Sequence, residues 1–226
     1  SMSFRSSVSA VSAAFGSSVL SEYPEKRPIQ QVQAQVAFGE GGGGVSSAHQ
    51  HLGDIFWAAG HKRAVQARMD GFTVNHVGSY EGWHKIVGEA RRYWTTYLAV
   101  AKPLKVTRCA VRYINRLEMP VGQELERQLK TYPAIGSGLP SLIDEYMFRC
   151  VLSFGVQRRA AITQTTVPIE ENAGANTRGL LLDIDAFSER ELSPNSEELW
   201  DEFEALRTIK NQCFFDSLQP VTWQTY

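Results

Sequence analysis

The amino-acid sequence predicts an α+β fold, in which curved, mainly antiparallel sheets carry long amphipathic helices packed on one side. Short runs rich in β-branched and aromatic residues follow one another, and turn sequences such as Asp70-Gly71 join them as hairpins. Two long segments instead repeat apolar residues every three or four positions, which is typical of amphipathic helices. Strands joined by hairpins favour this class over a doubly wound parallel sheet.

The N-terminal part is expected to contain a helix, a strand and a loop. Apolar residues recur at spacings of three and four within residues 1–22, which predicts an N-terminal helical segment. Pro24 and Pro28 stop that helix and begin an extended run. Apolar residues then alternate with glutamines as far as Phe38, which predicts a half-buried strand with one apolar face. The glycine run that follows lacks the GK[ST] sequence of a phosphate loop, so we interpret residues 39–53 as a flexible loop.

The remaining elements follow from the same two periodicities. The longest apolar stripe begins at Ser79 or Tyr80 and ends at Pro103, which predicts a long helix. Ser196 is the predicted N-cap of the last helix, whose early acids and later bases complement the helix dipole. Strands are expected at 55–58, 64–69, 72–75, 106–119, 145–154, 161–167 and 180–184, with a short helix at 124–129.

The domain organisation is expected to be simple. A chain of 226 residues is long enough to bury a substantial core, and we predict a single domain, 1–226. Its first and second parts both predict strands followed by a long helix. This pattern suggests a pseudo-duplication, although no residue-level repeat is visible.

Composition and charge limit the classes of partner. The 23 basic and 24 acidic residues give a net charge of −1, whereas proteins that bind nucleic acid usually carry a basic excess. Nucleic acid is therefore not the favoured partner, although a local basic face would still allow it. No apolar run approaches the roughly 20 residues that cross a bilayer, so no membrane partner is expected. Three widely spaced cysteines predict buried thiols in a reducing compartment, and we expect a cytoplasmic protein.

One predicted strand carries three arginines. Because side chains alternate between the faces of a strand, Arg108, Arg112 and Arg116 share one face, and Asn115 lies on the other. Three guanidinium groups in a row could hold a phosphate or carboxylate ligand. Alternatively, they form a solvated face or pair with neighbouring acids.

Two aspartates form a second candidate site. Asp183 and Asp185 are two residues apart, so they share one face of a later strand. Two such carboxylates could hold Mg²⁺ together with a substrate phosphate. A simpler hypothesis is that they pair with the arginine row on an adjacent strand.

The sequence shows no recognisable catalytic motif. The patterns GxGxxG, GxxxxGK[ST], HExxH and GxSxG are all absent. His49 and His51 have no further ligand at a suitable spacing, and a zinc site needs three or four, so neither a metal nor a cofactor is expected. Enzymatic activity stays uncertain, and the missing motifs favour a non-enzymatic protein.

Several segments occur in an order that resembles a known family. From about Leu20 to the end, the chain is similar to a sporadically distributed prokaryotic family of hypothetical proteins of unknown function. The strand that contains Arg-Tyr-Ile-Asn is the most specific part of this resemblance. The segments that carry it are KRAVQ at 62–66, FTVN at 72–75, YEGW at 80–83, VRYINRL at 111–117, LDIDAF at 182–187 and CFFDSL at 213–218.

The resemblance implies little chemistry, but it has one structural consequence. Its patchy distribution suggests defence or toxin–antitoxin loci. Members of the family usually begin with a Pro-Pro-Ile-Val-Glu-like strand, whereas this sequence begins in the helix. A missing strand would leave a sheet edge open, and open edges invite pairing. We therefore expect a homodimer or another protein that fills the edge.

Two functional hypotheses follow. The first is a non-enzymatic protein-interaction or regulatory module, which the absent motifs and the open edge favour. The second is a small-molecule or nucleotide-binding domain, or a phosphate-handling enzyme. In that case Arg108, Arg112 and Arg116 would hold an anion, and Asp183 and Asp185 would hold a metal ion.

Overall fold

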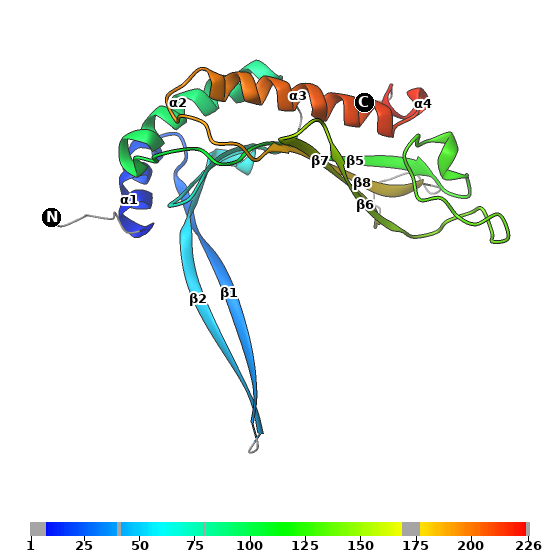
Figure 1. Ribbon diagram of the computed structural model, residues 1–226, viewed down its shortest axis with the longest axis horizontal. Helices are drawn as coiled ribbons and strands as arrows, with labels where there is room; N and C mark the ends of the chain where they lie inside the picture. The colour runs from blue at the N-terminus through cyan, green and yellow to red at the C-terminus, as the bar shows by residue number, and fades with distance from the viewer. Residues whose placement is uncertain (1–7, 40–41, 79, 169–176, 225–226) are drawn as a thin grey trace. The chain divides into compact units, whose positions relative to one another are not determined.

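Pro103 marks the boundary between two units of the chain, 1–103 and 104–226, each with its own four-stranded antiparallel sheet (Figure 1). The computed structural model describes residues 8–39, 42–78, 80–168 and 177–224, and for residues 9, 32–39 and 42–49 it describes the backbone alone. The predicted α+β class is confirmed. The sequence predicts one domain, whereas residue contacts divide the chain in two.

The first unit combines one meandering sheet with two long helices. Its strands lie in the order β1-β2-β3-β4, and all neighbours are antiparallel. The elements are α1 (Val8–Val19), β1 (Glu25–Gly39), β2 (Gly42–Trp57), a 3₁₀ turn (Ala59–His61), β3 (Arg63–Arg68), β4 (Phe72–His76) and α2 (Trp83–Ala101). The predicted long helix is therefore confirmed, with its end two residues before Pro103.

The core of the first unit lies between one face of this sheet and both helices. The buried residues of α1 recur every four positions, as Val11, Phe15 and Val19, which is the spacing of a helix face. Phe15 contacts the ring of Phe56 on β2, with the centroids 5.9 Å apart. The same buried cluster includes Tyr97 of α2. The apolar faces of the two helices and of the sheet thus pack together in one core.

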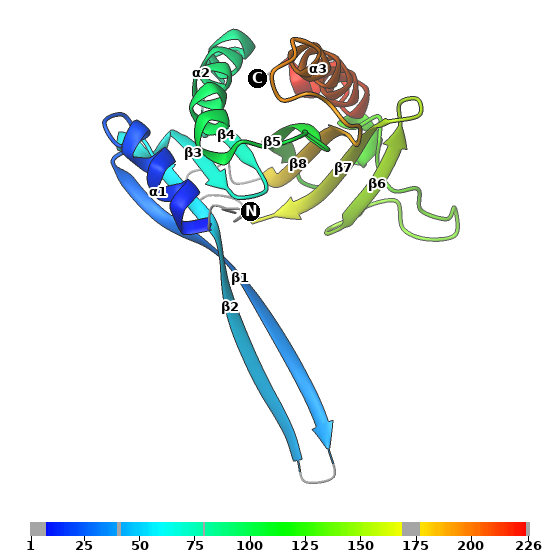
Figure 2. The ribbon, with the colours of Figure 1, turned by 60° about the vertical axis from the view of Figure 1, so that its left-hand side comes forward.

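The prediction of a flexible loop at 39–53 is wrong for the residues of this range that the structure describes, Gly39 and 42–53. Gly42–Leu52 belongs to β2, and all of these residues except Leu52 lie opposite a residue of β1 (Figure 2). The sequence suggested a loop because four consecutive glycines weaken strand propensity. Hydrogen bonding to β1 overrides that local preference. The apolar face that the sequence predicts as far as Phe38 lies outside the residues whose side chains are described.

Gly53 marks the point where the β1–β2 ribbon leaves the sheet. The register between the two strands shifts next to Ile29, which indicates a β-bulge. Gly53 has a φ of 152°, and a Cβ atom there would lie 2.3 Å from the carbonyl oxygen of Ala67. Only glycine allows β3 to approach this closely. Beyond this point β2 has β1 as its partner, and β3 covers only Gly53–Trp57.

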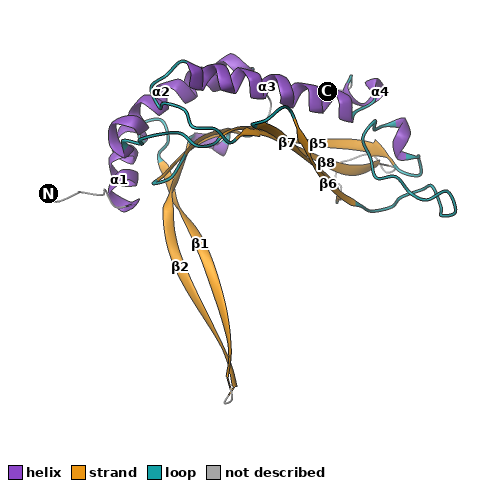
Figure 3. Cartoon of the chain, viewed as in Figure 1, coloured by secondary structure: helices purple, strands orange, loops and turns teal. Residues whose placement is uncertain are grey.

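The second unit has a different strand order, β5-β8-β7-β6. Its elements are β5 (Cys109–Pro120), a 3₁₀ turn (Leu125–Arg127), β6 (Met147–Ser153), β7 (Arg158–Val167), β8 (Thr177–Ser188), α3 (Glu198–Ser217) and α4 (Pro220–Trp223). Helix α3 packs against β5, β7 and β8 (Figure 3). Both units therefore have four strands and a long C-terminal helix, but the suggested duplication does not extend to strand order.

The predicted N-cap of the last helix is wrong. Glu197 occupies the N-cap position, and its side chain makes no capping hydrogen bond. The Ser196 hydroxyl instead donates to the carbonyl oxygen of Ser193 at 3.0 Å, which closes a turn before the helix. Among the described helices, none is both long and apolar enough to cross a membrane.

Candidate functional site

The arginine and aspartate strands are neighbours, so the predicted pairing between them is confirmed. Arg108, directly before β5, donates to Asp185 of β8 at 3.0 Å. Arg112 donates twice to Asp183, at 2.8 and 2.6 Å. The Cα atom of Arg112 lies opposite that of Asp185, but its guanidinium group reaches diagonally to Asp183. Each aspartate is therefore held by a charge-assisted hydrogen bond.

The other two predicted site residues lie apart from these pairs. Arg116 donates to the carbonyl oxygen of Pro168 at 2.5 Å. Asn115 donates to the carbonyl oxygen of Leu182 at 3.1 Å. A metal ion between Asp183 and Asp185 would have to displace guanidinium donors first. In the described part of the chain, no three His, Cys, Asp or Glu residues are grouped to hold a metal.

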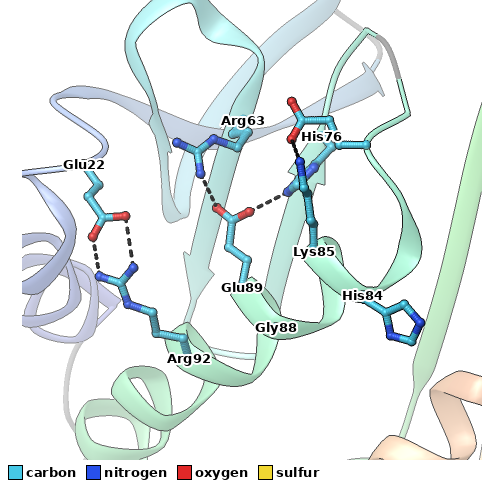
Figure 4. Close-up of a pocket in the computed structure, with 9 residues that line it drawn as sticks. Glu22, Arg63, His76, His84, Lys85, Gly88, Glu89 and Arg92 are labelled. Carbon is cyan, nitrogen blue, oxygen red and sulfur yellow. Dashed lines mark hydrogen bonds and ion pairs between the residues drawn. The ribbon is translucent and has the colours of Figure 1, made fainter.

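A polar pocket of about 380 Å³ lies in the first unit (Figure 4). Strands β3 and β4 provide one side, and the first three turns of α2 provide another. Its lining residues are Glu22, Arg63, His76, Glu81, His84, Lys85, Gly88, Glu89 and Arg92. Charged and imidazole groups dominate this set, so a ligand of the pocket would be polar or charged.

Glu89 is the centre of the pocket. Arg63 and His76 lie directly opposite each other on the β3–β4 hairpin, and both side chains approach the carboxyl group of Glu89 (Figure 4). His76 Nε2 lies 2.5 Å from Glu89 Oε2, within hydrogen-bonding distance. Arg63 lies 3.7 Å from Oε1 of the same carboxyl, too far for a good hydrogen bond. Side chains of both His76 and Glu89 are only 11% exposed.

Burial shifts the two members of the pair in opposite directions. Desolvation raises the pKa of Glu89, and the negative charge of Glu22 adds to this effect. Desolvation lowers the pKa of His76, and the positive charge of Arg63 acts in the same direction. An acid with a raised pKa beside a base with a lowered pKa is a common arrangement at sites that exchange protons.

The rim of the pocket consists of ion pairs that are already formed. Arg92 donates two hydrogen bonds to Glu22, which also accepts one from the Tyr93 hydroxyl at 2.8 Å. The Arg92 hydrogen bonds lower the pKa of Glu22. Lys85 lies 3.4 Å from Glu81. Figure 4 shows the ring of His84 directed away from Glu89.

No pattern in the sequence indicates this pocket. Its components are separated by up to 70 residues, and none forms a motif. One feature of the sequence does distinguish Glu89: it is the single acidic residue within α2. Recognising its role requires knowing that β3 and β4 face this part of the helix, and local periodicity does not provide that.

The β1–β2 ribbon is a further candidate. We define the arm as Gln30–Gly39 together with Gly42–His51, the paired residues that lie beyond β3. Figures 1 and 2 both show this ribbon extending away from the helices of its own unit. Between Ile29 and Leu52 the sequence contains a single Asp, Glu, Lys or Arg residue, Glu40.

A buried carboxylate anchors the base of the arm. Asp54 of β2 is 2% exposed and accepts a hydrogen bond from Ser12 of α1. Lys26 of β1 lies 2.8 Å from it, and His51 lies 3.0 Å away. Burial alone would raise the pKa of Asp54, but hydrogen bonds from Lys26, Ser12 and His51 outweigh burial and lower it. The ion pair and hydrogen bonds join α1, β1 and β2 where the arm begins.

Comparisons with known proteins give no further guidance: no protein-family model, no curated protein and no solved structure matches this chain. The resemblance to a sporadic prokaryotic family therefore stays a prediction.

Proposed function

We propose that this chain is a non-enzymatic interaction protein that works by β-strand pairing along the arm. The observation that carries the proposal is the length of unpaired strand edge. The outer edge of β1 has no neighbouring strand among the described residues, and β2 has β1 as its one partner from Gly42 to Leu52. Unpaired edges expose backbone N–H and C=O groups that can pair with another strand.

The sequence of the arm supports the same proposal. Proteins usually protect an exposed edge with charged side chains, proline or a short strand. Pro28 lies at the base, next to Lys26 and Arg27, but the paired residues of the arm contain no proline, lysine or arginine. An isolated two-stranded ribbon is also marginally stable in water. A third strand would supply both hydrogen bonds and support.

The occupant that fits best is the arm of a second copy of this chain. Two identical edges can pair antiparallel about a twofold axis, which gives a closed dimer. Identical strands repel each other when they carry like charges. The paired residues of the arm carry no Asp, Glu, Lys or Arg, so that penalty is absent.

The direct test is an arm-less variant. Val32 and His49 are opposite each other, so residues 33–48 can be replaced by Asn-Gly, which favours a two-residue hairpin turn. We expect the complete chain to be a dimer by light scattering at micromolar concentration and the arm-less variant to be a monomer. The arm-less variant keeps every core residue that the structure describes in this unit, so the circular dichroism of the variant should be that of a folded protein.

A single charge provides a finer test with a matched control. Gln31→Lys adds a charge at an exposed position of the arm, whereas Gln66→Lys adds one to β3, which has strands on both sides. We expect the first substitution to weaken the dimer and the second to leave it unchanged. A complete chain that stays monomeric would contradict self-pairing. A co-purifying protein that the arm-less variant loses would assign the edge to a foreign strand.

No specific contact favours the alternative of a phosphate-handling enzyme that uses the arginine strand. Arg108 and Arg112 hydrogen bond to Asp185 and Asp183, which would otherwise be the metal ligands.

A further inference from the structure

We propose that the pocket between the β3–β4 hairpin and α2 binds a small oxyanion, a phosphate or carboxylate group, through Arg63. We further infer that binding is coupled to the uptake of one proton by the His76–Glu89 pair. This site is separate from the arm, so it adds a ligand-binding function to the proposed interaction function.

The guanidinium group of Arg63 has N–H donors that are available to a ligand of the pocket. This guanidinium group makes no hydrogen bond to any residue that the structure describes, and its nearest acid is Glu89 at 3.7 Å. Its guanidinium group lies over the ring of Tyr23, 5.9 Å from the centroid. By contrast, Arg92 and Arg68 each donate two hydrogen bonds to a carboxylate. A guanidinium fork matches the oxygen spacing of phosphate and carboxylate.

The charges around Arg63 explain why proton uptake should accompany the anion. Glu22 is paired with Arg92, and Glu81 is paired with Lys85, so the charges within each of these two pairs largely cancel. Glu89 is the remaining acid near Arg63, and in its ionised form it both neutralises Arg63 and repels an incoming anion. A proton on the His76–Glu89 pair removes that repulsion. By linkage, anion binding and proton binding then strengthen each other.

The burial of Glu89 favours proton uptake by this pair. The side chain of Glu89 is 11% exposed, and its Oε1 atom is buried without a hydrogen-bond partner among the described residues. An unsatisfied buried carboxylate oxygen is costly, whereas protonation lowers that cost. Burial accordingly raises the pKa of Glu89. Arg63 itself is 44% exposed and borders the pocket, so a ligand can reach its donors.

Sulfate is the appropriate probe, because it keeps its charge between pH 5.5 and 7.5 and any pH dependence must come from the protein. Calorimetric titration of the complete chain at constant ionic strength should show affinity that rises as pH falls. Uptake of one proton per anion limits that rise to about tenfold per pH unit. A parallel titration with acetate above pH 6 distinguishes a carboxylate site from one that prefers tetrahedral oxyanions.

Three variants test the assignment. Arg63→Gln should abolish sulfate binding, whereas Arg68→Gln, on the same hairpin but paired with Asp70, should leave it unchanged. Glu89→Gln keeps the shape of the side chain but cannot ionise, so it should bind sulfate more tightly than the wild type at pH 7.5. Its affinity should depend less on pH, because His76 is then the one titratable member of the pair. Thermal melts of each variant establish that it is folded.

The outcomes that overturn the proposal are distinct from those that affect the arm. Equal sulfate binding by Arg63→Gln would mean an adventitious ion only, and binding that does not change with pH would remove the coupling to Glu89. No binding at any pH would refute the site altogether. The arm-less variant should bind sulfate normally, so failure of one proposal leaves the other intact.

Discussion

At the scale of single residues, Gly53 is the position where backbone geometry is most restrictive. Its φ of 152° is rare for L-residues, and an added Cβ would meet the carbonyl oxygen of Ala67 at 2.3 Å. We expect Gly53→Ala to lower the free energy of unfolding by about 2 kcal/mol or more. Gly71→Ala is the matched control, because nothing lies within 4 Å of its Cβ position. Urea titration of both variants measures the difference.

The diagonal pairing of Arg112 with Asp183 gives a second prediction at this scale. A double-mutant cycle to alanine should show coupling of about 0.5–1 kcal/mol between these residues, because the hydrogen bonds are bidentate but the arginine is 57% exposed. The cycle between Arg112 and Asp185, which face each other by Cα register, should show less. Larger coupling with Asp185 would contradict the observed geometry.

At the scale of elements, a partly buried ion pair joins α3 to its sheet. Glu202 of α3 is 2% exposed and accepts two hydrogen bonds from Arg158 of β7, each 2.8 Å long. Glu202→Gln should cost about 2 kcal/mol, since it weakens both bonds and leaves Arg158 without its counter-charge. Glu204→Gln, with a side chain 52% exposed, is the control. Chemical denaturation followed by circular dichroism measures both.

The same pair predicts how the stability of this element depends on pH. Hydrogen bonds from Arg158 lower the pKa of Glu202 below the usual 4.5. A depressed carboxyl pKa gives stability that is present above the unfolded value and is lost as pH falls through the folded value. We therefore expect acid to destabilise the wild type below about pH 4.5 more steeply than it destabilises Glu202→Gln. Parallel acid dependence in the two proteins would exclude this contribution.

Some of these elements can be predicted from local patterns in the sequence, and others cannot. Helix α2 and the alternation on β5 were predictable, because apolar periodicity decides both. The pairing of the arginines with the aspartates followed from the same alternation on two adjacent strands. The arm was missed because glycine lowers local strand propensity, while pairing across the hairpin decides the outcome. The pocket was missed because Arg63, His76 and Glu89 meet only through tertiary packing.

At the scale of the whole molecule, self-pairing would make stability depend on protein concentration. Association that occurs only in the folded state stabilises it by mass action. The melting temperature of the complete chain should therefore rise with concentration over the micromolar range, whereas that of the arm-less variant should stay constant. Scanning calorimetry at several concentrations measures this. A constant melting temperature for both would indicate that the arm forms no stable assembly.

The length of the arm would also set the distance between the two subunits of the proposed dimer. Each of its strands has ten residues, Gln30–Gly39 and Gly42–His51, which span about 33 Å at roughly 3.3 Å per residue. Two arms paired along their length would act as a ruler that separates the bodies of the two subunits. Removing two residues from each strand would shorten that ruler by about 7 Å and keep every side chain on its face. Removing one residue from each strand would instead move every side chain beyond the deletion to the opposite face of the arm. The second subunit would then meet the other face.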